Sequence, residues 1–139
     1  MFTLRIKLNM NNSNTENNLI NLNILSSILF IIGSLVSLSI TINEKRNINN
    51  EKKIYSNNEA LNISFYNRIL VLIAVLISLY VGYSNFKSEE KGSRAKYKSS
   101  LLLTTNVLTV IGSIIILYVS YLNKMEQSLT VSDVENPLI

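Results

Sequence analysis

Hydrophobic residues are concentrated in three long stretches that polar segments separate. The stretches cover residues 24–42, 69–83 and 101–122, and none of them contains Asp, Glu, Lys or Arg. A helix rises about 1.5 Å per residue, so roughly 20 residues cross the hydrocarbon core of a bilayer, which is about 30 Å thick. The second stretch reaches this length when it is extended to 65–86, which includes Arg68. The pattern therefore predicts three membrane-spanning helices, over about 19–42, 65–86 and 101–122.

The predicted fold is an all-α membrane protein in which three transmembrane helices pack as a small bundle. Residues 19–122 form one three-span membrane domain, since a chain of 139 residues leaves no room for a second. We expect residues 1–18 to form a polar N-terminal tail and residues 123–139 to form an acidic C-terminal tail. The connecting loops are polar and lack an apolar face, so we expect them to be irregular or disordered.

The N-terminal tail has a pattern of its own. Apolar and polar residues alternate strictly from Phe2 to Met10, which is the periodicity of a strand. A lone strand has nothing obvious to pair with, so we expect a disordered tail, or an upstream extension whose true start is Met10. The tail also lacks the apolar segment of a cleavable signal peptide.

Composition agrees with a membrane location. Hydrophobic residues make up 47% of the chain and charged residues 16%, against roughly a quarter charged in an average soluble domain. The net charge is +4, but the basic residues flank the apolar stretches, which favours attraction to a membrane surface over nucleic-acid binding. Abundant Asn, Ile, Lys and Ser are typical of an AT-rich genome. We therefore expect a bacterial cell membrane, with a host or viral membrane as the alternative.

Orientation is predicted from the Lys and Arg residues in the short segments outside the spans. The N-terminal tail and the second loop share one side and carry seven such residues. The first loop and the C-terminal tail share the other side and carry five, or six if Arg68 is counted. This difference favours a cytoplasmic N-terminus and an external C-terminus.

Arg68 and several aromatic residues are expected at the levels of the lipid head groups. Arg68 lies one turn inside the second predicted span, from which its long side chain can extend to the interface. Amphipathic aromatic rings are also most stable at this boundary. The rings expected beside Arg68 are Tyr66, Tyr118 and Tyr121, and those expected at the opposite face are Tyr80, Tyr83 and Phe86.

Each predicted span carries small residues four positions apart. Helices in lipid associate through close backbone approach, so such residues are candidates for helix packing. The candidates are Gly33, Ser37 and Thr41 in the first span, Ala74, Ser78 and Gly82 in the second, and Thr105, Thr109 and Ser113 in the third. Asn106 lies on an adjacent face and could hydrogen-bond a neighbouring helix. The rows favour a tightly packed bundle or a homo-oligomer, although small residues are common in spans.

No catalytic, cofactor-binding or metal-binding motif is present in the sequence. His and Cys are both absent, and all nine acidic residues lie outside the predicted spans. Without His, neither a Ser–His pair nor a zinc-protease motif can form. Four scattered glycines make no phosphate-binding loop, and no acidic residue lies mid-membrane to couple transport to an ion. We expect no cofactor and no enzyme activity.

Three functions remain open. The first is a non-enzymatic membrane protein that acts by helix packing with itself or with a partner membrane protein. The second is membrane permeabilisation, because the size and three-span layout are similar to those of three-span phage holins. That resemblance is architectural and carries no motif, and the acidic 123–139 tail departs from the basic tail of such holins. The third is a small transporter or channel component.

Overall fold

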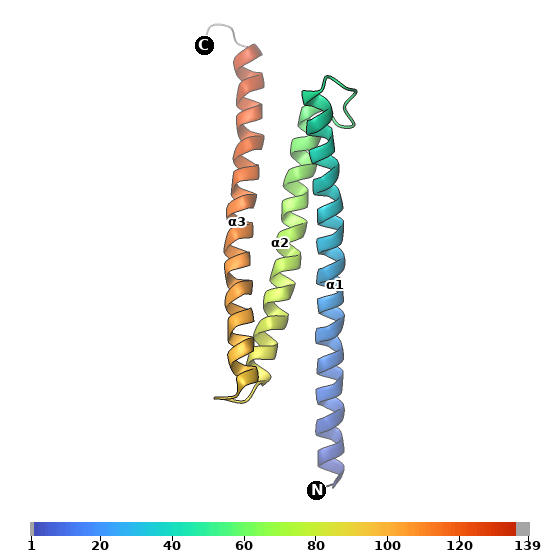
Figure 1. The fold of residues 1–139 in the computed structure, drawn as a ribbon, viewed down its shortest axis with the longest axis vertical. Helices are drawn as coiled ribbons and strands as arrows, with labels where there is room; N and C mark the ends of the chain where they lie inside the picture. The colour runs from blue at the N-terminus through green and yellow to red at the C-terminus, as the bar shows by residue number, and fades with distance from the viewer. Residues whose placement is uncertain (1, 136–139) are drawn as a thin grey trace.

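The computed structural model describes the backbone of residues 2–135 and the side chains of residues 13–127. It contains three α-helices, α1 (Phe2–Ile48), α2 (Asn57–Ser88) and α3 (Arg94–Glu135), and no strand within the described range (Figure 1). The predicted all-α fold with three long helices is therefore confirmed.

All three helices are long and apolar enough to cross a membrane. The qualifying segments are Ser13–Ile48, Asn57–Ser88 and Arg94–Gln127, with lengths of 36, 32 and 34 residues. At about 1.5 Å per residue, each exceeds the ~30 Å hydrocarbon core, so polar turns at the helix ends extend past it. These features are those of a multi-pass membrane protein.

Helix α1 differs from the sequence expectation at its start. It begins at Phe2 and runs without a break through the Asn-rich segment that was expected to be a disordered tail. Helix elongation costs little once a helix has formed, because each added residue gains one backbone hydrogen bond. The apolar part of α1 supplies that established helix. Alternating polarity over nine residues is too weak to override it where no strand partner exists.

The loop between α1 and α2 is shorter than expected because polar side chains order both of its ends. The Oδ1 atom of Asn43 accepts hydrogen bonds from the backbone nitrogens of Ile54 and Tyr55, at 2.8 and 2.9 Å. Ser56 and Glu59 form a capping box, in which each side chain accepts a hydrogen bond from the other residue's backbone nitrogen. As a result α2 begins at Asn57, eight residues before the predicted span.

The turn between α2 and α3 is equally tight. Gly92 has a φ of +78°, in the left-handed region that favours glycine. Ser93 then starts α3, because its Oγ atom accepts a hydrogen bond from the backbone nitrogen of Lys96 at 3.0 Å. The Nζ atom of Lys96 donates to the carbonyl oxygen of Phe86, so this lysine joins the end of α2 to the start of α3.

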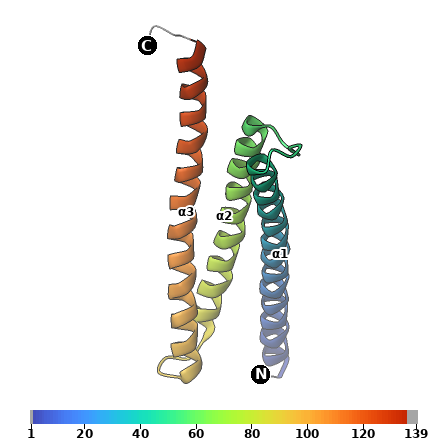
Figure 2. The same cartoon turned by 45° about the horizontal axis from the view of Figure 1, so that its top comes forward.

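The three helices form a row with α2 in the middle. Helix α2 packs against both α1 and α3, whereas no Cα–Cα distance between α1 and α3 is 8 Å or less among the described residues. Figures 1 and 2 show this order from two directions, with the N-terminus of α1 at the same end as the α2–α3 turn. Consecutive helices are therefore antiparallel, and only the central helix, α2, is covered on two sides.

The less exposed positions of each helix recur at alternating spacings of three and four. This is the seven-residue repeat of helices that cross at about 20° in a left-handed bundle. On α1 they are Leu19, Leu22, Ser26, Leu29, Gly33, Val36, Ile40 and Asn43, and on α3 Leu103, Asn106, Val110, Ser113, Leu117, Ser120 and Lys124. Helix α2 carries two such rows, one for each neighbour.

Candidate helix-packing site

The buried residues between the helices are small or polar. The buried apolar side chains in the described range are Ala74, Val75 and Val81. The buried polar ones are Ser26, Asn43 and Asn67, at 1%, 3% and 6% exposed. A soluble domain would use a large apolar core, but in lipid apolar side chains gain nothing by turning inward. Hydrogen bonds and close packing therefore hold these helices together.

Ser26 and Ser78 join α1 to α2. The Oγ atom of Ser26 donates to the carbonyl oxygen of Ala74 at 2.9 Å and lies 2.7 Å from the Oγ atom of Ser78. A hydroxyl has one hydrogen, and Ser26 gives it to Ala74, so Ser78 is the donor in the bond between the hydroxyls. The backbones can approach this closely because both partners on α2 are small.

Asn67 makes a second connection between α1 and α2. Its Nδ2 atom donates to the carbonyl oxygen of Gly33 and to the Oγ atom of Ser37, both at 3.0 Å. Its Oδ1 atom has no hydrogen-bond partner among the described residues. Gly33 is needed here because a Cβ atom at this position would lie 2.8 Å from Cγ2 of Val71. The glycine therefore lets Asn67 reach the backbone of α1.

Asn106 and Gly82 make the matching connection between α2 and α3. The Nδ2 atom of Asn106 donates to the carbonyl oxygen of Ser78 at 3.2 Å. A Cβ atom on Gly82 would collide with that same amide nitrogen, so Gly82 provides the space in which Asn106 lies. The predicted hydrogen bond from Asn106 to a neighbouring helix is confirmed. Ser78 thus binds α1 through its hydroxyl and α3 through its carbonyl.

The structure brings together most of the predicted packing residues. The α1–α2 contact contains Gly33, Ser37, Ala74 and Ser78. Gly82 lies against α3. Ser113 is half-buried on the row of α3 that faces α2. Thr41, Thr105 and Thr109 are exposed instead. Their hydroxyls donate within their own helices, to the carbonyl oxygens of Ser37, Leu101 and Thr105 respectively.

Spacing explains both the exposed threonines and the residues that sequence reasoning missed. Positions four apart drift by about 40° around a helix at each step, whereas positions seven apart stay within about 20°. Thr41, eight positions after Gly33, therefore leaves the face that Gly33 occupies. Ser26 precedes Gly33 by seven residues, and Asn67 precedes Ala74 by seven, so a search at this period would have found both.

Arg68 lies deeper along α2 than its position in the predicted span suggested. Because α2 begins at Asn57, Arg68 is about three turns from the helix start rather than one. It is half-buried. Side chains on a helix point back toward its N-terminus, which here is the nearer end, so the guanidinium is directed toward the interface.

The tyrosines expected at the two head-group levels are exposed. Tyr66 and Tyr118 are 64% and 60% exposed near one end, and Tyr80 and Tyr83 are 57% and 47% exposed toward the other. Lys124 lies near the first group, with its Nζ atom 5.8 Å from the ring centre of Tyr66. Rings on the outer surface are placed to contact lipid.

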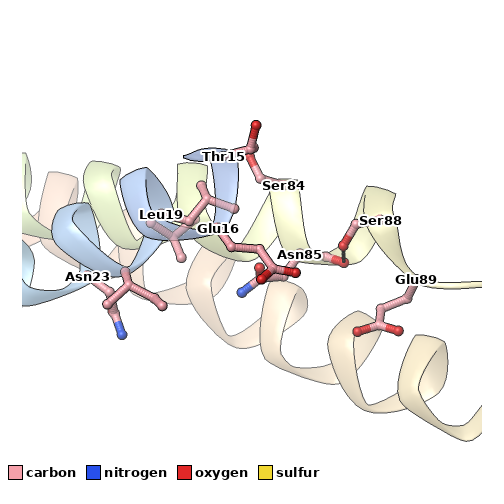
Figure 3. Close-up of a pocket in the computed structure, with 10 residues that line it drawn as sticks. Thr15, Glu16, Leu19, Asn23, Ser84, Asn85, Ser88 and Glu89 are labelled. Atoms are coloured by element: carbon pink, nitrogen blue, oxygen red, sulfur yellow. Dashed lines mark hydrogen bonds between the residues drawn. The ribbon is translucent and has the colours of Figure 1, made fainter. Parts of the chain in front are cut away.

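A polar groove lies between α1 and α2 near the N-terminal end of α1. Its volume is about 740 Å³. Figure 3 shows its lining, with Glu16 and Asn23 on α1, Asn85 on α2, and Glu89 directly after the end of α2. In the described part of the chain, no group of three His, Cys, Asp or Glu side chains that could hold a metal ion is found.

Substitution of Gly33 by Ala is expected to destabilise the fold, because the new methyl group overlaps Val71. Overpacking costs about 1–3 kcal/mol, partly offset by the higher helix propensity of Ala. The loss is measured as the free energy of unfolding, obtained from SDS titration in mixed micelles followed by far-UV circular dichroism.

A rescue variant and a control accompany this test. Adding Val71→Ala to Gly33→Ala removes the overlapping Cγ2 atom and should restore stability. Gly112→Ala is the control, since nothing lies within 4 Å of its Cβ position. Equal stability of the two glycine variants would contradict the packing described.

Substitution of Asn67 by Ala is expected to lower the free energy of unfolding by about 0.5–1 kcal/mol. Hydrogen bonds between membrane helices contribute about 0.6 kcal/mol on average, and removing the unpaired Oδ1 atom limits the loss. Asn62→Ala is the matched control, because Asn62 is exposed on the same helix. The same SDS titration compares them. If both variants lose the same stability, Asn67 does not act through its contact with α1.

Comparison with known proteins adds no family to this description. No protein-family model, curated protein or solved structure matches the chain.

Proposed function

We propose that this chain is a non-enzymatic multi-pass membrane protein that acts by packing its helices against a partner membrane protein or a second copy of itself. The arrangement of the helices in a row carries this proposal. Helices α1 and α3 each pack against α2 alone within the described residues, and α3 has no buried residue from 94 to 127. Most of the surface of the outer helices is therefore available to another helix.

The exposed row on α3 supports a protein partner on that helix. Thr105 and Thr109 are both exposed and lie four positions apart, so they share one face of α3. Their hydroxyls donate to carbonyl oxygens of the same helix, at 3.1 Å for Thr105 and 2.8 Å for Thr109. The row thus presents methyl groups rather than free hydroxyls, a surface against which a second helix can pack.

The alternative functions have less support. A pore or transport path needs polar groups on a surface that water can reach. Here the polar side chains between the helices are bonded to one another, as in the pairs Ser26–Ser78 and Asn67–Ser37. A single row of three helices also encloses no channel. A holin-like or channel activity would require several copies to assemble around a lumen.

We further propose that the N-terminus and the α2–α3 turn lie in the cytoplasm. The chain contains no cysteine, so single cysteines can report their side of the membrane. In intact cells, a membrane-impermeant maleimide should label Asn49→Cys in the α1–α2 loop and should leave Ala95→Cys unlabelled until the membrane is opened. Labelling of Ala95→Cys alone in intact cells would reverse the assignment.

Cysteine crosslinking in native membranes tests the packing function. Thr105→Cys and Thr109→Cys are expected to form disulfide-linked species under mild oxidation, because the exposed row meets a partner. The matched controls are Leu108→Cys and Ile115→Cys, which are exposed at similar depth on a different face of α3. Equal crosslinking at all four positions, or at none, would contradict a specific partner face.

The same cells distinguish packing from permeabilisation. A membrane-potential dye should report an unchanged potential at high expression of the native chain. The holin-like alternative would be favoured by two results together: the native chain collapses the membrane potential, and the Gly33→Leu variant does not.

A further inference from the structure

An apolar groove runs along the outer surface where α2 meets α3. Its volume is about 420 Å³, and almost all of its lining is apolar. The lining residues are Leu76, Leu79, Tyr80 and Tyr83 from α2 with Leu103 and Val107 from α3. A single acyl chain can lie in an apolar hollow of this size.

Positive charge lies at the end of this groove. Tyr83 lines the groove, and the Nζ atom of Lys87 lies 5.3 Å from the centre of the Tyr83 ring. The segment from 87 to 98 carries five cations against the two carboxylates of Glu89 and Glu90. Lys96 is held over the ring of Phe86 at 3.7 Å, while Lys87 and Lys91 are exposed. Arg94 and Lys98 are also exposed, but Lys87 is the cation that its contact with Tyr83 places beside the groove.

The opposite end of the molecule has a different charge balance. In the α1–α2 loop region the positive and negative charges nearly balance. The cations are Lys45, Arg46, Lys52 and Lys53, and the carboxylates are Glu44, Glu51 and Glu59. The hollow at that end is lined largely by polar residues of all three helices, including Asn43, Glu44 and Gln127. An apolar groove that ends in excess positive charge is thus found at the α2–α3 turn and not at the α1–α2 loop.

We propose that the α2–α3 groove binds an acyl chain of an anionic phospholipid, whose phosphate lies against Lys87 and Lys91. The groove supplies apolar contact for the chain, and the lysines supply attraction for the phosphate, which a zwitterionic lipid satisfies less well. This proposal rests on the membrane placement in the proposed function but not on any protein partner. It makes the protein selective for the lipid around it.

Fluorescence quenching by brominated lipid tests the proposal on the full chain. The protein has no tryptophan, so its tyrosine emission reports contact with brominated acyl chains. Two sets of phosphatidylcholine vesicles contain the same fraction of phosphatidylglycerol and the same fraction of brominated lipid. In one set the bromine is on phosphatidylglycerol, and in the other it is on phosphatidylcholine. We expect stronger quenching in the first set, and Tyr80→Phe with Tyr83→Phe should remove that difference.

Charge and groove variants separate the two halves of the site. Lys87→Gln with Lys91→Gln should lower the relative affinity for phosphatidylglycerol by roughly fivefold per lysine. The control, Lys52→Gln with Lys53→Gln, removes the same charge at the other end of the molecule and should leave the relative affinity for phosphatidylglycerol unchanged. Val107→Phe fills the groove and should also reduce selectivity, whereas Leu108→Phe on the exposed neighbouring position should not.

Three results would overturn the proposal. Equal quenching by both brominated lipids would show that the groove does not select a head group. If both double lysine variants lose the same relative affinity for phosphatidylglycerol, the preference comes from the overall charge of the protein and not from this site. Preferential quenching that disappears as the protein-to-lipid ratio rises would indicate that a second copy covers the groove. Absence of quenching by either lipid would instead refute the membrane placement, and the proposed function would fail with it.

Discussion

The hydrogen bonds made by Ser78 are the interaction on which the arrangement of the three helices depends. Its hydroxyl meets Ser26 of α1, and its carbonyl oxygen accepts from Asn106 of α3. Both contacts require small neighbours, which Ala74 and Gly82 provide one turn away on either side. One turn of α2 therefore fixes the depth of both neighbours. Asn67 and Asn43 extend the contact with α1 toward the loop.

The solvent explains why such contacts are polar. In water, burial of large apolar side chains would drive the helices together, and polar groups between them would add little. Lipid removes that drive, because Leu and Ile are as stable outside the bundle as inside it. The large apolar residues accordingly lie on the outer surface, as Ile31, Leu35 and Leu108 do. The small and hydrogen-bonding residues lie between the helices, and the usual distribution is reversed.

The helices could be predicted from the sequence because span length depends on bilayer thickness alone. Their ends could not be located as well, since Ser56 and Glu59 extend α2 through a capping box that hydropathy does not report. Gly33, Ala74 and Ser78 were found from four-residue spacing, whereas Asn67 was missed because it lies seven residues from Ala74, beside Arg68. Which face of α3 meets α2 depends on Asn106 and Gly82 together. Neither residue determines that face alone.

The lack of contact between α1 and α3 has a consequence for biosynthesis. Among the residues that the structure describes, every helix–helix contact joins neighbours along the chain, so none has to wait for a distant segment to be translated. The first hairpin can complete its bonds from Ser26 to Ala74 and from Asn67 to Gly33 before α3 packs against α2. The carbonyl of Ser78 then accepts Asn106 when the last helix arrives. The contacts therefore allow sequential assembly, in which each helix docks on one already in place.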